Sequence, residues 1–169
     1  QHAMNLVLRM GLPAFMSEHQ NDPPDETAVG SDLMKADQIA AKVNRHERGR
    51  IPIDASELVM FVDVQGDVLF YAVVAWAEGF TGYVVDYGSE PEQSTPYFRV
   101  ADVRRTLKHL APNTGMEAAI YSGLDRLVNA KCGRDYMRDD GSPMRVSRCL
   151  IDANWGDSTD VVYQFCRQS

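Results

Sequence analysis

Three runs of apolar residues dominate the middle of the chain, and turn residues separate them. The first run, Leu58 to Val64, is almost continuously apolar and carries one acid, Asp63, near its end. Val68 to Trp76 and Thr81 to Tyr87 follow, each after a short turn that contains glycine. Strands joined by short turns pair antiparallel, so we predict a three-stranded meander in which the first run is a central strand.

The spacing of apolar residues changes from strand-like to helical after residue 99. Intervals of three and four residues predict helices over Val100–Leu110 and Glu117–Cys132. A fourth strand is predicted at Val146–Ala153, with Asp152 near its end, and an amphipathic helix at Asp157–Gln168. The long helical crossover would bring the fourth strand parallel to the first. The predicted fold class is therefore α/β, a mixed sheet flanked by helices.

The first 34 residues are more polar and loop-like than the rest. The residue pattern from Leu6 to Glu18 predicts a short helix or an extended arm. The prolines that follow predict a linker at 20–34. A helix is predicted over 32–46, with Asp32 as a candidate cap. We therefore expect an arm and linker at 1–34 and one domain at 35–169.

Composition excludes several classes of protein. Hydrophobic residues make up 44% of the chain and charged residues 24%, as in ordinary globular domains. No apolar run reaches the ~18 residues of a membrane helix, so no membrane partner is expected. The three cysteines show no CxxC spacing, which supports neither a disulfide framework nor a zinc site and favours a reducing intracellular compartment.

Charge is unevenly distributed along the chain. The net charge is −7, yet residues 54–98 contain eight acids and no Lys or Arg, while residues 99–148 contain ten bases and six acids. The acidic block could gather divalent cations and the basic block could meet phosphate, although both also describe solvated faces. The candidates for phosphate contact are Arg104, Arg105, Lys108, Lys131, Arg134 and Arg138.

Asp63 and Asp152 are the strongest candidates for a catalytic site. They are predicted to end neighbouring parallel strands, where two carboxylates repel each other unless a cation lies between them. Oxygen ligands favour Mg²⁺ or Mn²⁺, and a two-metal site can hydrolyse a phosphodiester. The alternative is that each acid only accepts local hydrogen bonds. Further acids that could support such a site, or be solvated turn or cap residues, are Asp67, Asp86 and Asp157.

Two segments resemble a known family. LVMFVDVQGDVLFYAVVAWAEGFTGYVVDYG at 58–88 and CLIDANWGDSTDVVYQFC at 149–166 resemble the nuclease domain of phage terminase large subunits of the lambda GpA type. That domain is similar to the ribonuclease H-like fold. AFMSEHQNDP at 14–23 resembles the stretch that joins the terminase ATPase domain to its nuclease.

The resemblance implies an endonuclease that cuts concatemeric double-stranded DNA during genome packaging. It matches Asp63 and Asp152 to acids that bind two Mg²⁺ or Mn²⁺ ions. It also implies a terminase ATPase domain, a small terminase subunit and a portal as partners, in the cytoplasm of a bacterial host. Nothing here matches the family's ATP-binding loop, so no ATP hydrolysis is expected. The family's further acid, near the C-terminal end of the domain, has no counterpart before Ser169, so we expect that end of the domain to be missing.

Three other functions fit the same residues. A transposase- or resolvase-type nuclease would share the acids, but the terminase-like stretch at 14–23 argues against it. A non-catalytic ribonuclease H-like module could bind DNA or capsid-assembly proteins. A small α/β domain with structural acids is the simplest alternative. Metal binding at Asp63 separates the nucleases from the other two.

Overall fold

The protein, seen in a computed structural model, divides into two compact units, Gln1–Arg45 and His46–Ser169. The structure describes residues 2–12, 14–16, 35–42, 46–95, 98–154 and 159–169. In the first unit, α1 spans His2–Met10 and α3 spans Ala36–Ala40. The predicted helix over 32–46 therefore ends earlier than expected, at Ala40.

Several predictions for the first unit lie outside the described residues. These are the whole linker at 20–34, which includes the cap Asp32, and residues 43–45 of the predicted helix. The helix or arm predicted for Leu6 to Glu18 is a helix, α1, over the part that is described, with further helical residues at Ala14 to Met16.

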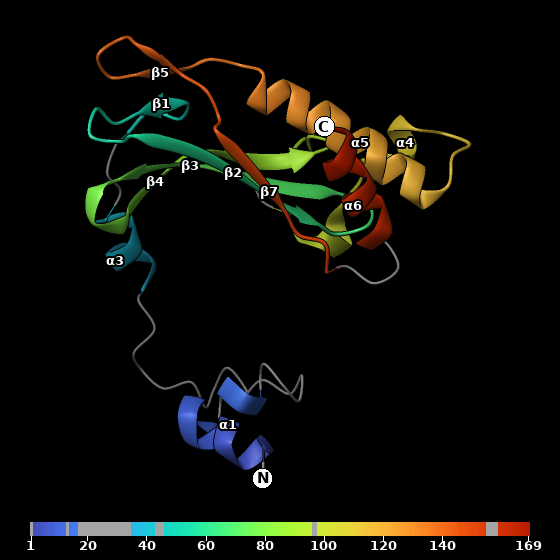
Figure 1. Cartoon of the computed structure of the whole chain (residues 1–169), viewed down its shortest axis with the longest axis horizontal. Helices are drawn as coiled ribbons and strands as arrows, with labels where there is room; N and C mark the ends of the chain where they lie inside the picture. Colours follow the sequence, from blue (N-terminus) through green and yellow to red (C-terminus); the bar gives the residue numbers. More distant parts are fainter. Residues whose placement is uncertain (1, 13, 17–34, 43–45, 96–97, 155–158) are drawn as a thin grey trace. The chain divides into compact units, whose positions relative to one another are not determined.

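A four-stranded sheet forms the centre of the second unit (Figure 1). Its strands are β2 Glu57–Val64, β3 Leu69–Ala77, β4 Thr81–Glu90 and β7 Arg148–Ile151, in the order β4-β3-β2-β7. The strand β3 is antiparallel to both β2 and β4, and β7 is parallel to β2. The predicted meander and the parallel pairing of the fourth strand with the first are both confirmed.

A smaller sheet was not predicted. It consists of β1 Arg50–Ile51, β5 Tyr136–Arg138 and β6 Pro143–Met144, with β5 parallel to β1 and antiparallel to β6. Strands of two or three residues are too short to show an alternating pattern of apolar residues. The second unit is thus a mixed α/β fold with two mixed sheets and several helices.

Two of the three predicted helices of the second unit are confirmed. The helix α5 spans Met116–Cys132, with Gly133 as its C-cap, and α6 spans Thr159–Gln168. Among the described residues, no helix has both the length and the apolar character needed to cross a bilayer.

The predicted helix over Val100–Leu110 is wrong. A 3₁₀ helix at Val100–Asp102 is followed by an irregular turn and then by α4, Leu107–Leu110. The side chain of Thr106 accepts the N–H of His109 and starts α4 as a new helix. Gln93 Oε1 accepts the backbone N–H groups of Arg104 and Arg105, at 3.1 and 3.2 Å, in place of helical carbonyls.

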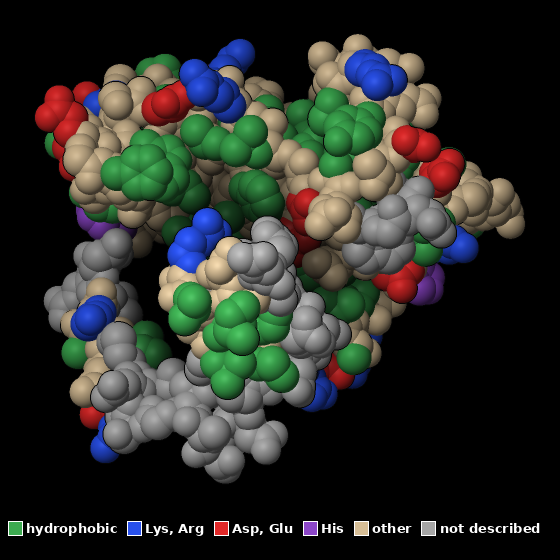
Figure 2. Space-filling model, turned by 60° about the horizontal axis from the view of Figure 1, so that its bottom comes forward, with side chains coloured by type: hydrophobic (Ala, Val, Ile, Leu, Met, Phe, Trp, Pro, Cys, Tyr) green, Lys and Arg blue, Asp and Glu red, His purple; other side chains and the backbone are tan. Residues whose placement is uncertain are grey.

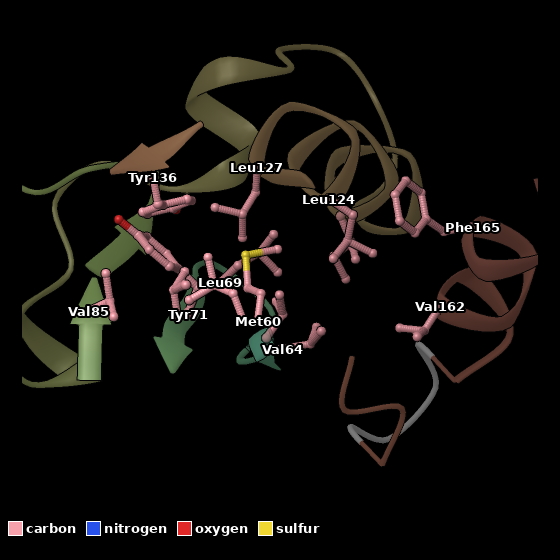
Figure 3. Close-up of a cluster of buried hydrophobic side chains, with 14 of the residues drawn as sticks. Met60, Val64, Leu69, Tyr71, Val85, Leu124, Leu127, Tyr136, Val162 and Phe165 are labelled. Carbon is pink, nitrogen blue, oxygen red and sulfur yellow. The ribbon is translucent and has the colours of Figure 1, made fainter. Parts of the chain in front are cut away.

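The hydrophobic core lies between one face of the larger sheet and helices α4, α5 and α6. Along β2 every second residue is buried, which places Met60 and Val64 on this face. Figure 3 shows these side chains together with Leu124 of α5 and Phe165 of α6 in one cluster. The alternation of a strand then directs Asp63 to the opposite face of the sheet.

Candidate active site at the ends of two parallel strands

The candidate acids Asp63 and Asp152 lie side by side at the ends of β2 and β7. The two strands pair in parallel up to Val62 and Ile151, so Asp63 and Asp152 follow that pair directly. The N–H of Asp152 also donates to the Val62 carbonyl at 2.8 Å, which extends the pairing beyond β7. Neighbouring strands are ~4.8 Å apart, and residues in register point to the same face. The backbone therefore holds the two carboxylates as neighbours.

Each acid is oriented by a group two residues further along the chain. The side-chain amide of Gln65 donates to both oxygens of Asp63, at 2.9 and 3.0 Å. The backbone N–H of Asn154 donates to Asp152 Oδ1 at 2.9 Å. The role of Gln65 was missed in the sequence, although residues at i and i+2 of an extended strand share a face and could have indicated it.

The face of the sheet that bears the acids, opposite α5 and α6, is called the open face here. Beside the acids it carries Phe61 and Leu150, a register pair whose exposed fractions are 47% and 55%. Apolar side chains are also exposed among charged ones in the view of Figure 2. Asp63 and Asp152 are themselves half-buried, so a ligand approaching the open face could reach both.

Asp86 lies on the other face of the sheet and is not brought together with Asp63. It pairs in register with the buried Val73, next to a bulge in the β3–β4 pairing, and is only 4% exposed. Lys131 Nζ lies 3.0 Å from Asp86 Oδ2, and the Arg48 guanidinium lies 2.7 Å from Oδ1. The Tyr71 hydroxyl is 3.4 Å from Oδ2. We call these four residues the Asp86 cluster.

Electrostatics explain why Asp86 stays ionised although it is buried. Burial alone would raise the pKa of its carboxyl group, but hydrogen bonds from Lys131 and Arg48 outweigh this and lower the pKa below its ordinary value. Burial likewise opposes the charge of Lys131, while Tyr71 and Asp86 raise its pKa overall. The cluster is therefore a buried ion-pair network within the fold.

The structure adds neither of the two remaining candidate acids, Asp67 and Asp157, to the site. Asp67 is exposed in the turn between β2 and β3, where its carbonyl accepts the N–H of Leu107 at 2.8 Å. Asp157 lies outside the described residues.

Three of the predicted phosphate-binding residues are exposed and close together in the chain. Arg104 and Arg105 lie in the turn before α4, and Lys108 lies in its first turn, so the three residues lie at a corner instead of along the helix predicted over Val100–Leu110. Gln93 fixes that corner, because its side chain also donates to the Arg105 carbonyl at 2.8 Å. Their side chains are available to an anionic partner.

The other three predicted phosphate-binding residues have contacts inside the protein. Lys131 pairs with Asp86. The Arg134 guanidinium lies over the Tyr136 ring, 4.3 Å from its centre, and Arg138 donates to the Ile53 carbonyl. Lys131 and Arg138 are half-buried, whereas Arg134 is exposed.

The side chains of Asp63 and Asp152 are suited to bind a hard divalent cation. Both supply carboxylate oxygens, the donors that Mg²⁺ and Mn²⁺ prefer. Within the part of the chain that the structure describes, however, no three His, Cys, Asp or Glu residues form a group that could hold a metal ion. The described residues thus offer two protein ligands, and metal binding stays a prediction.

The two acids lie at the carboxyl ends of parallel strands, the position where ligands bind in open α/β folds. Residues 15–169 match the family described as terminase large subunit gpA, endonuclease domain. Because the match covers most of the chain, the protein belongs to this family of phage DNA-packaging endonucleases. Membership implies nuclease activity, a hydrolase reaction, with DNA as the substrate. Searches of curated proteins and of solved structures each returned no match.

Proposed function

We propose that the protein cuts concatemeric double-stranded DNA during phage genome packaging, by hydrolysis that depends on two divalent metal ions. The observation that carries this proposal is the parallel β2–β7 pairing, which sets Asp63 beside Asp152 on the open face. Two neighbouring carboxylates repel each other, and a bound cation relieves that repulsion. The membership of an endonuclease family supplies the substrate class.

Asp63 and Asp152 would hold Mg²⁺ or Mn²⁺. Bound there, the ions would supply an activated water and stabilise the leaving oxygen of the phosphodiester. Gln65 would keep the Asp63 carboxylate in place, and the N–H of Asn154 would do the same for Asp152. Arg104, Arg105 and Lys108 would bind DNA phosphates and fix the position of the strand.

The proposal extends to the fold family and to the partners. A meander followed by a parallel strand next to the first supports a ribonuclease H-like fold. The family membership supports a terminase ATPase domain, a small terminase subunit and a portal as partners, in the cytoplasm of a bacterial host. It also favours a terminase over a transposase- or resolvase-type nuclease.

Nicking of supercoiled plasmid in Mn²⁺ tests the proposal. We expect nicking by the unmodified protein, loss of nicking in EDTA, and a loss of at least about a hundredfold in Asp63→Asn, because one of the two carboxylates that would hold the metal ions is gone. Asp125→Asn is the matched control, since Asp125 is exposed on α5 and accepts a hydrogen bond from the side-chain amide of Asn129, one turn further along the helix. Nicking by Asp63→Asn at the unmodified rate would contradict the proposal.

A second candidate, a non-catalytic DNA-binding module, is favoured by one observation. The described residues show only two neighbouring acids, without a third ligand. Mn²⁺ titration by calorimetry separates the two candidates. A nuclease site requires Mn²⁺ binding that Asp63→Asn weakens. DNA binding without any Mn²⁺ binding or nicking would identify the module.

A further inference from the structure

A cavity of about 530 Å³ opens at the edge of the larger sheet, between β4, the C-terminal half of α5 and the segment that follows β4. This volume suits a ligand the size of one nucleotide. Gly88 lies in the lining against Tyr71, where a Cβ atom would lie 3.1 Å from the Tyr71 ring. The cavity has no role in the proposed chemistry at Asp63 and Asp152, so its lining calls for a separate explanation.

The cavity lies at the same end of the sheet as the candidate active site. Its lining residues Phe70 and Ser89 are in register with Asp63, in one row across β2, β3 and β4. Two strand spacings separate the backbones of Asp63 and Ser89, or about 10 Å. A strand cut at Asp63 on the open face could reach the cavity by passing round the β4 edge of the sheet, because Lys131 and Arg48 in the lining lie on the side of Asp86.

Aromatic rings line the cavity on one side. Phe70 and Phe98 stack with their ring centres 5.6 Å apart, and Tyr87 lies exposed nearby in the lining. Bases of unpaired nucleotides stack on such rings, whereas bases inside a duplex are already stacked on one another. The aromatic lining thus favours an unpaired nucleotide over a base pair.

Positive charge lies at the other side of the cavity. Asp86 has one negative charge and two cationic partners, so the Asp86 cluster carries a net charge of +1. Arg48 is the outer cation, since its side chain is 59% exposed against 22% for Lys131. Its guanidinium lies over the Tyr87 ring, 4.9 Å from the centre, so a phosphate bound to Arg48 would have an aromatic ring beside it.

The lining also contains two acids, of which Glu90 has its carboxylate paired with an arginine while the carboxylate of Glu92 is exposed. Glu90 pairs with Arg126 at 3.0 Å, and the Arg105 guanidinium donates to the Glu92 carbonyl at 3.2 Å. Gln93, another lining residue, holds the backbone of Arg104 and Arg105. The exposed arginines that we expect to bind DNA are therefore fixed to the wall of the cavity.

We propose that this cavity binds one unpaired nucleotide of the DNA strand, with its base on Phe98 and Tyr87 and its phosphate on Arg48. The proposal rests on the proposed nuclease function and adds a requirement to it. DNA next to the cut is locally unpaired when bound, and the protein prefers duplexes that offer such a nucleotide.

Fluorescence anisotropy in EDTA tests the proposal without any cleavage. The probes are a blunt duplex and the same duplex with a few unpaired nucleotides at one end. We expect the 169-residue protein to bind the second probe at least about fivefold more tightly. Phe98→Leu and Arg48→Gln should each lose most of this preference, whereas Tyr163→Leu and Arg145→Gln, which change exposed residues outside the lining, should keep it.

The outcomes are distinct from those of the nicking assay. Equal binding of the two probes by the unmodified protein overturns the proposal, and so does a preference that survives both lining substitutions. Circular dichroism checks the fold of each variant; Arg48→Gln leaves the Phe70–Phe98 contact intact, so the test stands even where Phe98→Leu does not fold. Binding of deoxyadenosine monophosphate that both variants lose, without any preference for unpaired ends, would mean a site for free nucleotides and would also overturn the proposal.

Discussion

Asp63 and Asp86 are both acids on strands of the same sheet, yet their surroundings differ in every respect. Asp63 is half-buried on the open face, beside another acid, and its hydrogen-bond donor is the neutral amide of Gln65. Asp86 is buried on the opposite face, between two cations. A carboxylate next to a like charge is available to a cation from solution, whereas one that is already neutralised holds the fold together. Position in a strand alone does not distinguish these two roles.

The sharpest test of this comparison is the stability of the two Asn variants. Asp86→Asn leaves Lys131 partly buried without its carboxylate and should lower the free energy of unfolding by about 3 kcal/mol. Asp63→Asn should change it by less than about 0.5 kcal/mol, since the Asn side chain can still accept from Gln65. Urea denaturation measures both.

Asp135→Asn is the matched control for that experiment. Asp135 pairs with Arg145 at 2.6 Å, but both side chains are exposed and screened by solvent, so the loss of stability should be much smaller than in Asp86→Asn. A larger loss in Asp63→Asn than in Asp86→Asn would reverse the roles that we assign to the two acids.

The next largest effect concerns the exposed arginines near the cavity. Combining Arg104→Glu with Arg105→Glu should weaken binding of duplex DNA about tenfold or more at low salt and reduce the salt slope by about two. Arg145→Glu combined with Arg167→Glu makes the same change of charge at other exposed positions and should have a smaller effect. The same salt slope in both pairs would mean that DNA does not contact the 104–105 corner.

A smaller effect is expected from the groups that orient the two acids. Gln65→Ala removes the side chain that holds the Asp63 carboxylate in place. It should slow nicking about tenfold, as is usual when a residue that orients a metal ligand is removed. Asn154→Ala should have little effect, because Asn154 orients Asp152 through its backbone N–H, which alanine retains. Equal rates in the two variants would remove Gln65 from the site.

The smallest effect is the contribution of Asp86 to acid sensitivity. Its pKa in the folded protein is below the value of about 3.9 for an unfolded chain, so its contribution to stability is complete above that pH. The contribution is lost as the pH falls through the folded value, when the carboxyl group takes up a proton. In urea titrations at acid pH, Asp86→Asn should lose less stability on acidification than the unmodified protein. Parallel pH profiles would contradict this assignment.

The sequence predicts the larger sheet well because its strands are long apolar runs between glycine-containing turns. It also predicts the pairing of Asp63 with Asp152, since a parallel crossover next to a central strand leaves few alternatives. The prediction of a helix over 100–110 is wrong because the side chain of Gln93 accepts hydrogen bonds from backbone N–H groups of that segment. The spacing of apolar residues contains no information about this contact.

The environment of Asp86 was beyond prediction for a different reason. Its partners Arg48 and Lys131 come from segments 38 and 45 residues away, and the bulge beside Val73 alters the alternation of faces along β4. Tertiary contacts of this kind leave no local pattern in the sequence. The small sheet could not be predicted either, because its strands are too short to show a local pattern of apolar residues.

The pairing of β2 with β7 also has a kinetic consequence. It joins positions about 90 residues apart in the chain, so a large loop must close before Asp63 and Asp152 can meet. Contacts of such high sequence separation form slowly, and β2, β3 and β4 can pair with one another well before β7 is added. A chain still being synthesised could therefore hold its meander without holding the two-acid site. An activity that needs both acids would then arise only after β7 has paired with β2.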